Sequence, residues 1–143
     1  MLEKIDLGNG LILEIWDYSR KLAGDRWLVG FFAQVGVRPR KEDFSSSEYY
    51  EQFLAKTDGY LYYRYQKERT FVPETEVSKI FQSLRENFLK AVLPYLTKSN
   101  FKERLIQTEV ALFEKRIDWE MYLKAKEAEE EELEKQFGER EFI

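Results

Sequence analysis

The spacing of the apolar residues changes near Pro73, and this change constrains the fold more than any other feature of the chain. Before Pro73 the apolar side chains alternate with polar ones, which is the period of a β-strand. After Pro73 they recur every three or four residues, which is the period of an amphipathic helix. Strands followed by long helices predict an α+β fold, in which helices cover a mainly antiparallel sheet.

Four segments have the strand pattern, so we expect a sheet of about four strands. They are residues 2–7, 11–18, 26–37 and 60–71. Residues 19–25 are polar and are expected to form a loop. A short helix should precede the last strand, because Ser45 and Glu48 have the spacing of a capping box. The expected order is strand, strand, strand, helix, strand.

Two long helices should follow the sheet. The first begins after Pro73 and should kink or end at Pro94, which lacks the N–H that a helix needs. The second should run from Phe101 to about Phe137. We expect both helices to pack on one face of the sheet, so that residues 1–143 form a single domain.

The chain contains neither histidine nor cysteine. This absence excludes an imidazole base, a thiolate nucleophile, a disulfide and the usual zinc ligands. The sequence also has no phosphate-binding glycine loop and no nucleophile elbow. We therefore expect a protein that is not an enzyme, and we name no catalytic, cofactor-binding or metal-binding residue. The alternative is an enzyme that uses carboxylates and a divalent metal ion.

The last helix carries two apolar stripes separated by charged residues, although a surface helix usually has one stripe. The first stripe contains Phe101, Leu105, Leu112, Trp119 and Leu123. The second contains Ile106, Val110, Phe113, Ile117 and Met121. Our hypothesis is that one stripe packs on the sheet and the other contacts a second chain. The alternative is one broad apolar face crossed by the stems of charged side chains.

The first stripe is the candidate interface of this hypothesis. Arg116 and Glu120 are included in it and lie at a spacing of four residues, at which they could form an ion pair. The leading functional prediction is therefore a small protein-binding or assembly module that self-associates through its last helix as a homodimer, or that binds another protein.

Residues 127–143 form an acidic end, in which eight Glu residues stand against Lys135 and Arg140. The run from Glu129 to Glu132 has no cation between its members, so self-repulsion should loosen the helix there. We expect a solvated helix end that frays. The alternative is an acidic surface that docks on a basic partner.

A nucleic-acid or nucleotide-binding function is the runner-up prediction. Its candidate residues are the cations and tyrosines of the last strand and of the basic loops: Arg20, Arg26, Arg38, Arg40, Tyr60, Tyr62 and Arg64. Aromatic rings beside cations can stack on the bases of a single strand. Cross-strand aromatic packing is the favoured interpretation, because the pI of 5.1 is not the basic footprint of a nucleic-acid-binding domain.

No apolar run approaches the length of a membrane helix, and the first residues lack the apolar segment of a signal peptide. We therefore expect no association with a membrane and a cytoplasmic location.

Overall fold

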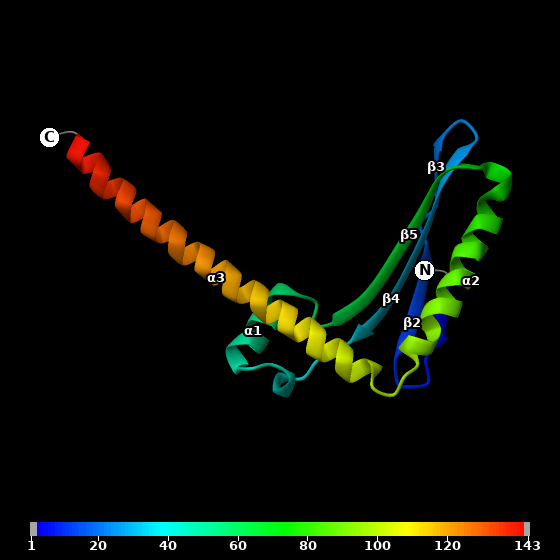
Figure 1. Cartoon of the computed structure of the whole chain (residues 1–143), viewed down its shortest axis with the longest axis horizontal. Helices are drawn as coiled ribbons and strands as arrows, with labels where there is room; N and C mark the ends of the chain where they lie inside the picture. Colours follow the sequence, from blue (N-terminus) through cyan, green and yellow to red (C-terminus); the bar gives the residue numbers. More distant parts are fainter. Residues whose placement is uncertain (1–2, 142–143) are drawn as a thin grey trace.

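The computed structural model describes residues 3–141, with side chains described through Phe137. It contains one antiparallel sheet and three α-helices, two of them long, so the predicted α+β fold class is confirmed (Figure 1). The strands are β1 (Glu3–Asp6), β2 (Ile12–Asp17), β3 (Arg20–Ala23), β4 (Arg26–Val37) and β5 (Leu61–Pro73). The helices are α1 (Ser47–Lys56), α2 (Val77–Leu96) and α3 (Phe101–Glu141), with short 3-10 turns η1 (Lys41–Asp43) and η2 (Glu74–Glu76).

Strand β4 lies at the centre of the sheet, between β5 on one side and β2 and β3 on the other. Strand β3 continues β2 in the same register against β4, because the pairs Leu13–Val35 and Arg20–Leu28 follow one diagonal. The expected loop over residues 19–25 is therefore wrong. The turn between β3 and β4 is only two residues long, because Gly24 adopts a φ of 58° and so permits a tight turn.

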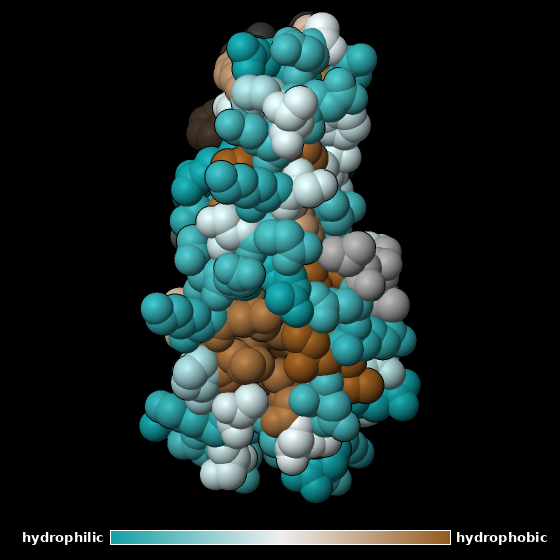
Figure 2. Space-filling model, turned by 90° about the vertical axis from the view of Figure 1, so that its right-hand side faces the viewer, coloured by the Kyte–Doolittle hydropathy of each residue, from teal (hydrophilic) through white to brown (hydrophobic). Residues whose placement is uncertain are grey.

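One face of the sheet packs against α2 and forms the main core. Phe31 of β4 lies at its centre, with its ring centroid 5.7 Å from that of Phe81 and 5.3 Å from that of Phe88. These two phenylalanines belong to the apolar stripe of α2. The helix ends two residues after Pro94, which lacks the backbone N–H that a helix needs. On the side where α2 lies, the surface is mostly hydrophilic, with one large hydrophobic area and smaller ones above it (Figure 2).

The opposite face of the sheet carries aromatic and polar side chains. The ring of Tyr18 lies on Gly30, where a Cβ atom would come within 2.4 Å of the ring. The Tyr18 hydroxyl donates a hydrogen bond to Glu68 and accepts one from Gln66, both at 2.8 Å. Partial burial raises the pKa of the Tyr18 hydroxyl. Glycine at this position therefore allows a tyrosine to lie flat on the sheet.

A second, smaller core joins α1 to α3. The rings of Phe44, Phe53 and Phe113 contact one another, with the Phe53 and Phe113 centroids 5.3 Å apart. The N-cap of α1 is Ser46 rather than the expected Ser45. The reason is that Ser45 donates both its backbone N–H and its hydroxyl to Glu114 of α3, each at 2.7 Å.

Helix α3 begins in the core of the folded body and ends far from that body. Phe101 is buried in the main core, and the helix then passes α1 and projects into solvent as a single rod (Figure 1). Every side chain from Met121 to Phe137 is exposed. The helix extends to Glu141, four residues beyond the predicted end, and residues 142–143 of the acidic end lie outside the described residues. Within residues 3–141, each helix is too short or too polar to cross a lipid bilayer.

Candidate functional site

The two predicted stripes of α3 have different surroundings. The second stripe packs on α1 through Val110, Phe113 and Ile117, which are buried. The first stripe is divided between the core and the solvent. Phe101 and Leu105 are buried in the core of their own chain and therefore cannot belong to the candidate interface. Their burial follows from the short connection after α2, which holds the start of α3 against the sheet.

The remaining part of the first stripe is exposed. Leu112, Trp119 and Leu123 all point to solvent, and Trp119 is 60% exposed. The Trp119 ring stacks on Tyr122, with centroids 5.6 Å apart and an interplanar angle of 26°. A stacked pair of aromatic rings in solvent offers a large rigid contact surface at low entropic cost.

The exposed part of the first stripe continues into the acidic end, although the candidate interface predicted from the sequence stops at Leu123. Leu133 is 47% exposed and Phe137 is 58% exposed. Counted together with Arg116, Lys126 and Glu130, these residues follow the alternating steps of three and four of a coiled-coil stripe, although the apolar members alone leave a gap of ten residues between Leu123 and Leu133. We call this surface the α3 seam; its apolar members are Leu112, Trp119, Leu123, Leu133 and Phe137, and its polar members are Arg116, Lys126 and Glu130.

Polar contacts fix the direction in which α3 leaves the molecule. Tyr49 of α1 donates a hydrogen bond to Asp118 at 2.5 Å, and Lys56 at the end of α1 donates to Glu120 at 2.6 Å. The Lys56 ammonium holds the pKa of Glu120 below its usual value, and Asp118 raises the pKa of Tyr49. Glu120 thus pairs with Lys56, and not with Arg116 as its spacing in the sequence would also allow. Both bonds lie within residues 118–120 of α3, just before the stretch in which every described side chain is exposed.

Four of the seven candidate nucleic-acid residues lie together on the face of the sheet that α2 leaves open. The Arg64 guanidinium lies 4.4 Å from the centroid of the Tyr62 ring, and that of Arg38 lies 5.4 Å from the centroid of Tyr60. The Tyr62 hydroxyl donates to Asp58 at 2.5 Å, which lowers the pKa of Asp58 and raises that of Tyr62. Each ring therefore already has a cation on one of its faces.

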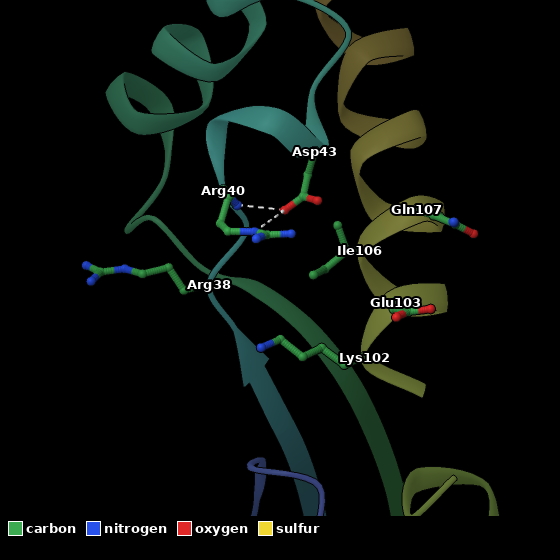
Figure 3. A pocket seen from close by; sticks show the side chains of 7 residues that line it. All are labelled: Arg38, Arg40, Asp43, Lys102, Glu103, Ile106 and Gln107. Atoms are coloured by element: carbon green, nitrogen blue, oxygen red, sulfur yellow. Dashed lines mark hydrogen bonds and ion pairs between the residues drawn. The ribbon is translucent and has the colours of Figure 1, made fainter. Parts of the chain in front are cut away.

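The other three arginines are elsewhere. Arg20 and Arg26 lie near the turn between β3 and β4, at the opposite end of β4 from Arg38. Arg40 lines a pocket of about 410 Å³ with Lys102 of α3, and its backbone N–H donates to Asp43 at 2.7 Å (Figure 3). Arg38 lines the same pocket, although its side chain extends away from that of Arg40 (Figure 3). Arg20 and Arg26 are thus separated from the other basic candidates by most of the length of β4, whereas Arg38 and Arg40 line one pocket.

Among the residues whose side chains the structure describes, no cluster of three or more acidic groups is arranged to hold a metal ion. No known protein family, curated protein or solved structure matches the chain.

Proposed function

We propose that this protein is a non-enzymatic assembly module that forms a homodimer through the α3 seam. One observation carries the proposal: a stripe with coiled-coil spacing, five of whose eight members are apolar, lies exposed along a helix that projects beyond its own core. Transfer of these apolar side chains from water into a packed interface would drive dimerisation, because burial of apolar surface is the dominant favourable contribution to most protein association.

The instability of a lone helix supports the same proposal. The exposed part of α3 beyond Glu120 lacks the tertiary packing from which most helical stability in proteins comes. The run from Glu129 to Glu132 adds like-charge repulsion. A helix that faces both costs gains most from a second helix along its apolar stripe.

The experiment is sedimentation equilibrium of the chain up to high micromolar concentration. We expect a monomer–dimer equilibrium, and we expect the double variant Trp119→Ser, Leu133→Ser to be monomeric over the same range, because both side chains lie on the seam. The matched control is Met121→Ser. Met121 is also exposed but lies on the opposite side of α3 from the seam, so dimerisation should be unchanged. A strictly monomeric wild-type chain would refute the proposal.

A second candidate is binding of single-stranded nucleic acid at the open face of the sheet. The observation in its favour is the placement of Tyr60 and Tyr62 between Arg38 and Arg64. Titration with a single-stranded RNA should then change the tyrosine and tryptophan fluorescence in a salt-dependent manner, and Arg64→Ala should abolish the change. No change at low salt would exclude this candidate.

A carboxylate enzyme that uses a divalent metal is the third candidate from the sequence, and no cluster of described side chains supports it. A rise in the melting temperature on addition of magnesium or manganese would revive it, because a ligand that binds the folded state stabilises that state.

A further inference from the structure

We infer that the two α3 helices pair antiparallel, in the register that brings Ala128 of one copy level with Ala128 of the other. This inference rests on the proposed homodimer and specifies its geometry. It follows from the order of residues along the α3 seam, together with their exposure.

The seam is self-complementary about Ala128. Reversal of the sequence around this residue places Trp119 opposite Phe137 and Leu123 opposite Leu133 of the second copy. All four side chains are exposed on the same stripe of α3. In an antiparallel coiled coil, each a position of the heptad lies opposite a d position of the partner helix. In this register each large apolar residue therefore contacts another large apolar residue.

The polar positions of the seam decide between the two directions. In the antiparallel register Lys126 lies opposite Glu130 of the second copy, and the reverse pair forms by symmetry. In a parallel, in-register pair each Lys126 would face Lys126 and each Glu130 would face Glu130. Like charges directly opposed in an interface destabilise it, whereas opposite charges set register and orientation.

The register also has limits and costs. The next layer outward would bring Arg116 opposite Arg140, so the matched stretch ends at Trp119 and Phe137. Glu127 and Glu129 flank the symmetry axis and would lie near their own copies. This repulsion weakens the dimer, so we expect a reversible association rather than an obligate one.

The geometry places the two folded bodies at opposite ends of a shared rod. The last contacts between α1 and α3 are at Glu120, and the centre of the pair is at Ala128. At a rise of 1.5 Å per residue, the points where the two helices leave their bodies would lie roughly 25 Å apart. The dimer is then a spacer that presents its two sheets away from each other.

Cysteine crosslinking tests the register directly, because the natural chain contains no cysteine. The two single variants are Lys126→Cys and Glu130→Cys, oxidised separately and as a mixture. We expect little disulfide-linked dimer from either variant alone and efficient linkage in the mixture, since facing positions of a coiled coil come within disulfide distance. Efficient self-linkage of either variant alone would overturn the antiparallel register.

Charge reversal provides a second readout that does not require oxidation. Lys126→Glu or Glu130→Lys alone should weaken the dimer about tenfold, because each places like charges opposite each other, and the double variant should restore it. In a parallel pair the single changes would only replace one like-charge layer by another.

The outcomes separate the two proposals. A monomeric wild-type chain refutes the dimer and the register together. A dimer that self-links through one cysteine variant, or that ignores both charge reversals, refutes only the register.

Discussion

The two halves of α3 have similar apolar content, but only the first half packs against the rest of its own chain. In the body half, residues 101–120, the apolar side chains Val110, Phe113 and Ile117 are closed off by α1. In the extension, residues 121–137, every side chain is exposed. The difference teaches that helical periodicity defines a surface that needs cover, but the rest of the chain decides whether its own core supplies that cover.

The largest expected effect comes from removal of a ring in the body half. Phe113→Ala should lower the free energy of unfolding by about 3–5 kcal/mol, because it leaves a cavity among buried aromatic side chains. The measurement is urea denaturation at a concentration where the chain is monomeric.

Phe137→Ala is the matched change in the extension. It should leave the unfolding of the monomer within about 0.5 kcal/mol of wild type, because the ring is exposed and outside the core. Equal losses in the two variants would abolish the distinction between the halves.

A glycine scan gives a smaller effect that probes the backbone alone. Ala111 and Ala128 are both exposed alanines of α3, one in each half. Ala111→Gly should cost about 1 kcal/mol in urea denaturation, because the body half folds together with the core. Ala128→Gly should leave that transition unchanged and lower the helical signal of the monomer by circular dichroism. A loss of core stability from Ala128→Gly would show that the halves fold as one cooperative unit.

The smallest expected effect concerns the Lys56–Glu120 ion pair, at the boundary between the halves. Because the pKa of Glu120 is lowered in the folded chain, the pair contributes stability above the ordinary pKa of a glutamate. That contribution is lost as the pH falls through the lowered pKa. In melting curves from pH 6 to pH 3, Glu120→Gln should therefore lose slightly less stability than wild type.

Glu127→Gln is the control, since Glu127 lies in the extension, beyond the last contacts to α1. At a concentration where the chain is monomeric, its melting temperature should follow that of wild type through the acid range. Identical curves for Glu120→Gln and wild type would show that the ion pair does not contribute.

Patterns within single elements were enough to predict the fold class. The alternation along residues 26–37 and the stripe of α2 both belong to one element each, and both predictions are confirmed. Register was harder to predict: β3 pairs with β4 because Gly24 allows a two-residue turn, while the polar composition of residues 19–25 favoured a loop. Polarity alone does not distinguish an exposed strand from a loop.

The candidate interface was predicted in part, for a similar reason. Leu112, Trp119 and Leu123 are exposed, but Phe101 has the same helical position and is buried, because tertiary contacts rather than periodicity separate them. Leu133 and Phe137 were overlooked among the glutamates, although their spacing from Trp119 and Leu123 was readable in the sequence. Charge composition therefore concealed an apolar pattern.

The projecting α3 has a consequence for how the molecule moves through water. Its 41 residues form a rod about 60 Å long. A compact globule of this chain length has a radius of gyration of only about 15 Å, so the rod is longer than such a globule is wide. Such a shape experiences more friction than a sphere of equal mass and tumbles anisotropically. On a gel-filtration column calibrated with globular standards, even a single chain of 17.3 kDa should elute early, at the position of a heavier protein.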